Sequence, residues 1–142
     1  MTEQIFPYAN IAAGVLILLV GFLFHFAGQL ISLVNRQLAV KIGIWEKDMI
    51  PEFEVYEKAI AAADVIIGLS YLISAIGLLL DAAWAYNLAW IPASIFIYHG
   101  ISYWFWVGNQ TRAGYPLNSL GMRTGWALIN VLTGIFTILV IW

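Results

Sequence analysis

Residues 8–35 read YANIAAGVLILLVGFLFHFAGQLISLVN, an apolar run without Asp, Glu, Lys or Arg. A helix that crosses the hydrocarbon core of a bilayer needs about 20 predominantly apolar residues, and this run is longer than that. Lipid offers the backbone no hydrogen bonds, so a single segment of this kind can cross only as a helix. The stretch therefore predicts a transmembrane α-helix and sets the class of the whole chain.

Three more apolar segments follow, at residues 59–80, 84–107 and 125–142. Each is long enough to cross the membrane as a helix. Only residues 81–83 separate the second segment from the third, so these two segments must run antiparallel. The sequence thus predicts an all-α fold, a four-transmembrane-helix bundle in which residues 1–142 form a single integral membrane domain with helices at about 8–35, 59–80, 84–107 and 125–142.

The composition supports the same class. Hydrophobic residues make up 63% of the chain and charged residues 10%, whereas ordinary globular domains carry about 25% charged residues. The chain has no cysteine, which excludes disulfides, thiolate metal sites and thiol catalysis. It also lacks a Gly-rich phosphate loop, a serine nucleophile elbow and a basic stripe for nucleic acid. Residues 1–7 have no basic region of a signal peptide, so we expect them to be retained.

The positive charges predict the orientation. All six basic residues fall in or beside two segments, residues 36–58 and 108–124. Cytoplasmic loops of membrane proteins carry the excess of Lys and Arg, so both segments are expected in the cytoplasm and both termini outside. We therefore expect a protein of the cytoplasmic membrane that has lipid as its main partner and binds no nucleic acid. A homo-oligomer or a larger membrane complex remains open.

The first connecting segment, residues 36–58, has two parts. Its beginning alternates apolar and polar residues up to Trp45, which predicts a short amphipathic piece with Trp45 at the inner interface. Its remainder, residues 46–57, is acidic through Glu46, Asp48, Glu52, Glu54 and Glu57. We expect this acidic part to be a solvated loop, with partner docking as the alternative.

The two halves of the chain share a weak repeat, which suggests a tandem duplication of a two-helix hairpin. Parallel repeats related by an axis along the membrane normal are known in transporters. Short hydrophobic matches also arise by chance, so the duplication is one of two interpretations. The matching residues are His25 and Asn35 with His99 and Asn109, and Asp64 and Gly68 with Asn130 and Gly134.

Four polar side chains are expected at one depth in the bundle interior: His25, Asp64, His99 and Asn130. At about 1.5 Å per helical residue they lie roughly 9–17 Å from the cytoplasmic boundary. Each shares a helix face with small or polar residues, and such faces pack against other helices. A carboxylate in the membrane costs about 2.5–3.5 kcal/mol on insertion scales, so Asp64 should be neutral or paired, with a histidine as its partner.

The leading functional hypothesis is a haem-binding membrane redox protein with His25 and His99 as the two axial ligands. Gly21, Gly28 and Gly100 would leave room for the macrocycle, and Arg36 or Arg123 would meet the propionates. Asp64 and Asn130 would orient the imidazoles through hydrogen bonds.

Three alternatives use the same residues. The first is a proton, ion or small-solute path, because intramembrane Asp and His residues line such relays. The second is a non-haem metal site formed by His25, His99 and Asp64. The third is a cofactor-free accessory subunit of a membrane complex, in which the polar layer only fixes helix register. Whether the chain is an enzyme stays open. The residues expected to support the site or to carry protons are Asp64, Asn130, Gln29, Tyr71 and Tyr103.

Overall fold

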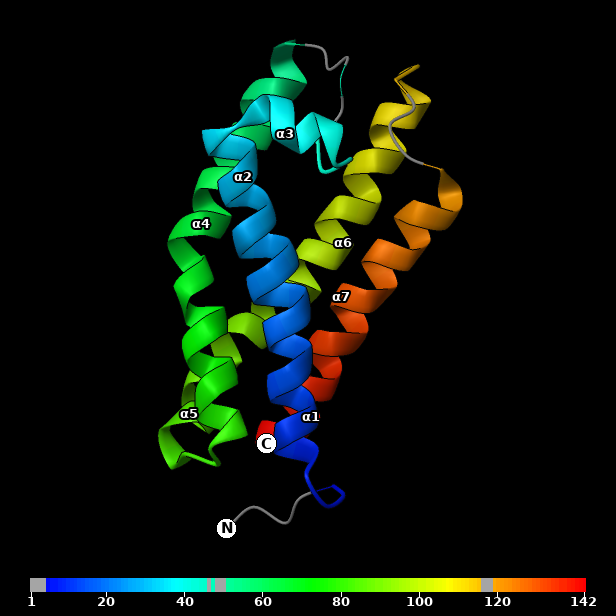
Figure 1. Ribbon diagram of the computed structural model, residues 1–142. Coiled ribbons are helices and arrows are strands. Elements are labelled where there is room, and N and C mark those ends of the chain that lie inside the picture. The colour runs from blue at the N-terminus through cyan, green and yellow to red at the C-terminus, as the bar shows by residue number, and fades with distance from the viewer. Residues whose placement is uncertain (1–4, 46, 48–50, 116–118) are drawn as a thin grey trace.

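The computed structural model describes residues 5–45, 47, 51–115 and 119–142, and within these ranges it contains helices and no strand. The all-α prediction is confirmed. Figure 1 shows two antiparallel pairs, one made by α1, η1 and α2 with α4, the other by α6 with α7. The elements are α1 (Ala9–Leu16), η1 (Ile17–Ala27), α2 (Gly28–Val34), α3 (Arg36–Lys41), α4 (Pro51–Leu79), α5 (Ala83–Leu88), α6 (Trp90–Arg112) and α7 (Leu120–Ile141).

Among the described residues, three helical stretches are long and apolar enough to cross a membrane: Ala9–Val34, Glu54–Leu79 and Leu120–Ile141. They coincide with the first, second and fourth predicted segments. The third predicted segment is also helical, as α6, but its Trp, Tyr, His and Ser side chains make it less apolar. Its passage through the membrane stays a prediction.

Two of these helices begin earlier than predicted. α4 begins at Pro51, so Glu52, Glu54 and Glu57 lie in its first turns and not in a loop. Proline suits the first position of a helix, and acidic side chains interact favourably with the positive end of its dipole. Glu46 and Asp48, also expected in the acidic loop, lie outside the described residues. α7 begins at Leu120, where the Ser119 hydroxyl accepts a hydrogen bond from the Met122 backbone N–H over 3.2 Å.

The short amphipathic piece is confirmed in its helical part as α3, and Trp45 follows it. The Asn35 side chain begins α3 by accepting a hydrogen bond from the Leu38 backbone N–H at 3.0 Å. The Trp45 backbone N–H donates to the Ala39 carbonyl oxygen, which folds the chain back under α3. Trp45 is therefore buried against the protein, and its depth in the membrane stays a prediction.

The reversal between α4 and α5 occurs at residues 80–82, as predicted. Asp81 adopts a left-handed conformation with φ of 52°, which Asp tolerates better than most residues. Its carboxylate accepts hydrogen bonds from the Tyr86 hydroxyl at 2.7 Å and from Asn10 Nδ2 at 3.5 Å. The predicted helix 84–107 is divided at Ala89 into α5 and α6. Pro92 causes the division, because it has no N–H to donate to a carbonyl one turn earlier.

The apolar core lies towards the end of the bundle that carries both termini (Figure 1). Ile17, Tyr71, Leu78 and Phe96 are its largest members. Towards the other end, α6 and α7 remain packed on each other and lean away from α2 and α4. The predicted polar layer lies between this core and the splayed end, which places it where the two helix pairs begin to separate.

Candidate functional site

His25 is the centre of the polar layer. It lies in η1, whose π-helical backbone is wider than an α-helix and in other proteins often marks a functional site. Its side chain is buried, and its Nε2 atom lies 2.7 Å from the Oδ1 atom of Asn130. Asn130 Nδ2 donates in turn to the Trp126 carbonyl oxygen at 2.9 Å. This second bond fixes the amide, so His25 Nε2 must carry the proton and donate it to Asn130 Oδ1.

The other ring nitrogen of His25 faces Asp64 of α4. His25 Nδ1 and Asp64 Oδ2 are 3.6 Å apart, which is longer than a hydrogen bond. Asp64 is only 6% exposed, and its Oδ2 atom has no hydrogen-bond partner within the described ranges. An unsatisfied carboxylate oxygen at this depth is costly and calls for a compensating group. The gap between His25 Nδ1 and Asp64 Oδ2 is where such a group would be held.

His99 of α6 completes the cluster. Its ring lies edge-on to that of His25, with 4.3 Å between the ring centroids and an angle of 86° between the planes. The Trp126 indole N–H donates to His99 Nε2 over 3.3 Å, a long hydrogen bond. Because an indole can only donate, Nε2 of neutral His99 must be the unprotonated nitrogen.

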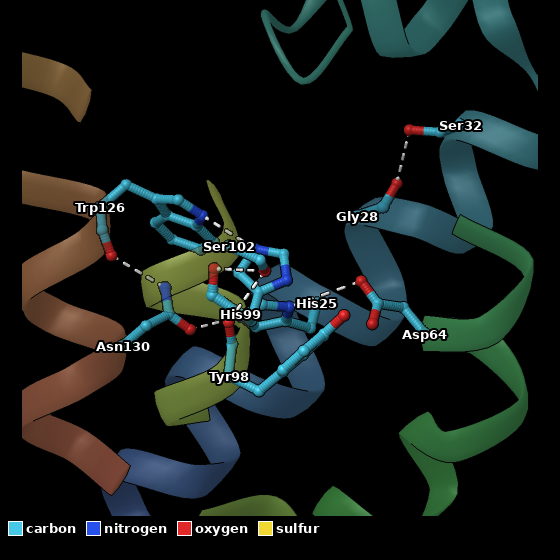
Figure 2. A network of polar contacts seen from close by, with 9 residues as sticks. All are labelled: His25, Gly28, Ser32, Asp64, Tyr98, His99, Ser102, Trp126 and Asn130. Carbon is cyan, nitrogen blue, oxygen red and sulfur yellow. Dashed lines mark hydrogen bonds and ion pairs between the residues drawn. The ribbon is translucent and has the colours of Figure 1, made fainter. Parts of the chain in front are cut away.

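The three residues form a group of potential metal ligands. One ligand atom from each of His25, Asp64 and His99 can be chosen so that all three lie within 4.8 Å of one another. Figure 2 shows the two imidazoles between the Asp64 carboxylate on one side and the Trp126 and Asn130 side chains on the other. All four residues predicted to form the polar layer therefore come together, one each from η1, α4, α6 and α7.

The other predicted residues lie around this group at varying distances. Tyr71 is fully buried and stacks on Phe96, and its ring centroid is 6.0 Å from that of His25. Tyr103 stacks on His99 with 6.2 Å between centroids. Gln29 is half-buried, one turn beyond His25 on the same helical stretch. Tyr71 and Tyr103 thus form walls of the cluster, whereas no described contact joins Gln29 to it.

Burial confirms the predicted interior positions of Asp64 on α4 and Asn130 on α7, whereas the face of α6 that carries His99 is less deeply buried. His99, Ser102, Tyr103 and Trp106 are only half-buried. The buried face of α6 is instead the one that carries its small residues, because these allow close approach to α7. Its members are Pro92, Ala93, Phe96, Gly100, Val107 and Gly108.

The glycines expected to make room for a macrocycle accommodate neighbouring side chains. A Cβ atom on Gly21 would lie 2.6 Å from the Tyr71 ring, and one on Gly100 would lie 2.8 Å from Val131. A Cβ atom on Gly28 would lie 3.6 Å from Ile44 Cδ1, which is an ordinary van der Waals distance. Gly21 and Gly100 therefore serve close packing in this arrangement, whereas Gly28 is not closely packed.

The half-buried face of α6 lines a groove of about 140 Å³ that separates it from α4, to which it packs only lightly. Asp64 and His99 line its deeper part. The aromatic rings of Tyr56 and Trp106, 5.4 Å apart, mark its other end. α4 contributes Tyr56, Glu57, Ile60, Ala63, Asp64 and Ile67, and α6 contributes Ile95, Tyr98, His99, Ser102, Tyr103 and Trp106.

Sequence reasoning missed two parts of this site. Trp126 was not among the predicted site residues, yet its indole donates to His99 and its backbone carbonyl accepts from Asn130. Its position one turn before Asn130 on α7 is the signal that could have identified it. Glu57 was counted in the acidic loop, yet it lies on the groove two turns before Asp64.

Comparison of the chain with models of protein families, with curated proteins and with solved structures finds no match in any of the three. The chemistry of the side chains is therefore what indicates a function.

Proposed function

We propose that this helical membrane protein binds one divalent transition-metal ion between His25, Asp64 and His99. The observation that carries the proposal is the buried Asp64 Oδ2 atom, which lacks a hydrogen-bond partner in the described ranges and lies 3.6 Å from His25 Nδ1. Two ligands of one tetrahedral zinc ion, each about 2.0–2.2 Å from the metal, are separated by about 3.4 Å. A shared ion would satisfy the carboxylate and the imidazole at once.

The hydrogen bonds around His25 support this assignment. An imidazole that binds a metal usually donates its other N–H to an oxygen, which fixes the tautomer and the ring orientation. His25 does so through Nε2 to Asn130, and Nδ1 is left to coordinate. Two imidazoles and one carboxylate suit zinc, iron(II) or cobalt(II) and are too few to fill the coordination sphere. The remaining positions are available to water or to a molecule in the groove.

The membrane placement that accompanies this proposal has α6 as a fourth span. The N-terminal end of α1 and the C-terminus lie at the end where α4 turns into α5, and α3 lies at the opposite end (Figure 1). Both basic connecting segments belong to that opposite end, which therefore faces the cytoplasm under the positive-inside rule. The metal site lies nearer to it. The duplication of a two-helix hairpin remains a proposal that the two antiparallel pairs support.

Haem remains the alternative occupant of the same two histidines. Two axial imidazoles on one iron have their ring centroids about 6 Å apart, given iron–nitrogen bonds of about 2 Å. The observed separation is 4.3 Å, so haem binding would require the rings to move apart. A Soret band in protein purified in mild detergent would support haem, and His25→Ala and His99→Ala should each abolish it. The proton path and the accessory role also stay predictions.

Zinc binding tests the proposal directly. Purified full-length protein in a non-ionic detergent is titrated with Zn²⁺ against a chromophoric chelator. We expect one ion per chain for the wild type and an at least tenfold loss of affinity in His25→Ala and Asp64→Asn, because each removes a ligand. Glu52→Gln is the matched control, because Glu52 is an exposed acidic residue on α4, the helix that carries Asp64. Stoichiometric binding that survives both ligand substitutions would refute the site.

A further inference from the structure

We propose that the groove between α4 and α6 binds a free organic cation that carries a quaternary ammonium head, with Glu57 and the surrounding aromatic rings as its receptor. The site lies towards the Tyr56 end of the groove, and the inference does not depend on the metal site.

Charge is the first argument. Two acidic residues, Glu57 and Asp64, line the groove, and the residues that line it include no Lys or Arg. Two basic side chains near the start of α4 are already paired: Lys58 lies 2.8 Å and Arg36 lies 3.5 Å from the Glu54 carboxylate. Asp64 belongs to the proposed metal site, so Glu57 is the carboxylate available to a ligand at the Tyr56 end of the groove. A cation therefore matches the groove, and an anion does not.

Aromatic walls are the second argument. Tyr56, Tyr103 and Trp106 line the groove beside Glu57, and Tyr56 and Trp106 pack on each other with 5.4 Å between their ring centroids, so together they form one aromatic wall. A quaternary ammonium is attracted to the faces of Trp and Tyr rings, and cages of such rings recognise it in other proteins. It has no N–H to donate, so it suits a lining that is mostly carbon. Metal ions, in contrast, need several oxygen or nitrogen ligands, which the Glu57 end does not supply.

Size and access are the third argument. A cavity of about 150 Å³ holds one benzene molecule, so a groove of about 140 Å³ accommodates a trimethylammonium head or one aromatic ring. Tyr98 on the rim is 72% exposed, so the groove is open to the surroundings of the chain. The phosphate of a choline lipid would be repelled by Glu57, which favours a free cation over a lipid headgroup.

Calorimetric titration with choline, a small trimethylammonium compound, tests this proposal on the full chain in non-ionic detergent. We expect saturable binding to the wild type, about tenfold weaker binding to Glu57→Gln, and unchanged binding to Glu52→Gln. 3,3-Dimethyl-1-butanol has the same shape without the charge and should not bind. Dodecylphosphocholine below its micelle concentration should not compete, which separates the free cation from a lipid headgroup.

A second variant removes the ring and keeps the charge. Trp106→Leu should weaken binding about tenfold through loss of the aromatic wall. Equal binding of the neutral isostere, unchanged binding in both Glu57→Gln and Trp106→Leu, or the absence of saturable binding would overturn the proposal. Zinc binding to Glu57→Gln is measured in parallel and should be unchanged, so failure of the cation site and failure of the metal site give different results.

Discussion

Asn130 acts on the site through a single bond to His25. Its amide is held by the Trp126 carbonyl oxygen, and it holds the imidazole in the tautomer that presents Nδ1 to Asp64. Loss of such an orienting partner typically lowers metal affinity about 10- to 100-fold. Asn130→Ala is therefore expected to bind zinc more weakly within that range, as measured by chelator competition.

Thr137→Ala is the matched control for Asn130→Ala. Thr137 is buried on the same helix but donates only to the Thr133 carbonyl oxygen one turn earlier. Its zinc affinity should equal that of the wild type. If Asn130→Ala bound zinc as tightly as Thr137→Ala, the orienting role of Asn130 would be wrong.

Whereas Asn130 orients His25 for metal binding, Trp126 competes with the metal for His99. Ligation through His99 Nε2 requires the atom that now accepts the Trp126 N–H, and ligation through Nδ1 would leave two N–H groups facing each other. Either way the ion must break this hydrogen bond. Trp126→Phe should therefore bind zinc several-fold more tightly than the wild type. Weaker binding in that variant would show that Trp126 supports the site and does not compete with it.

At the residue scale, the sequence predicted which side chains meet but not how they meet. An ionisable group in an apolar helix must find partners, so His25, Asp64, His99 and Asn130 could be grouped by depth and face. Their pairing depends on rotations of a few degrees about each helix. Nothing in the periodicity indicates that His25 would donate to Asn130, or that His99 would accept from Trp126.

At the scale of elements, glycines determine how closely α6 and α7 approach. A Cβ atom on Gly134 would lie 2.7 Å from the backbone oxygen of Ala93 and 2.7 Å from Ile97 Cγ1. Backbone atoms cannot move aside cheaply, and overpacking of this kind costs about 1–3 kcal/mol. Gly134→Ala should lower the unfolding midpoint in detergent by several degrees.

Gly125→Ala provides the comparison on the same helix. A Cβ atom there would have no neighbour within 4 Å among the described residues. Alanine favours the helix over glycine by about 1 kcal/mol, so this variant should be as stable as the wild type or slightly more so. Equal destabilisation by both substitutions would mean that the α6–α7 contact is not as close as described.

The helices themselves were predictable because apolar length and the absence of charge decide them. The residues at which they begin and end could not be predicted in the same way. The acidic residues before residue 59 were taken as a loop, yet acids at the first turn of a helix extend it, as in α4. The π-helical backbone of η1 and the division at Ala89 also went unpredicted, because hydrophobic periodicity does not report local backbone geometry.

At the scale of the whole molecule, the orientation can be tested with single cysteines, since the chain has none of its own. Asn87 is exposed at the turn-bearing end in α5, and Thr111 is exposed near the end of α6. In intact cells a membrane-impermeant maleimide should label Asn87→Cys and should label Thr111→Cys only after lysis. Labelling of both in intact cells, or the reverse pattern, would contradict the proposed topology.

Class is a whole-molecule property that apolar length predicts well, and the charge distribution predicts an orientation that this labelling tests. The separation of the two helix pairs could not be predicted in this way, because it depends on which faces of α4 and α6 pack against other helices. α6 uses its small residues against α7 and leaves its aromatic face towards α4. The groove results from this packing, and no motif in the sequence predicts it.

The ligand shell of the bound ion tests the central claim most directly. Zinc-edge X-ray absorption is recorded on the one-to-one zinc complex of the full chain. We predict scattering from two imidazoles about 2.0–2.1 Å from the metal together with a carboxylate oxygen, reduced to one imidazole in His99→Ala. A shell without imidazole scattering, or the same spectrum from wild type and His99→Ala, would contradict the account.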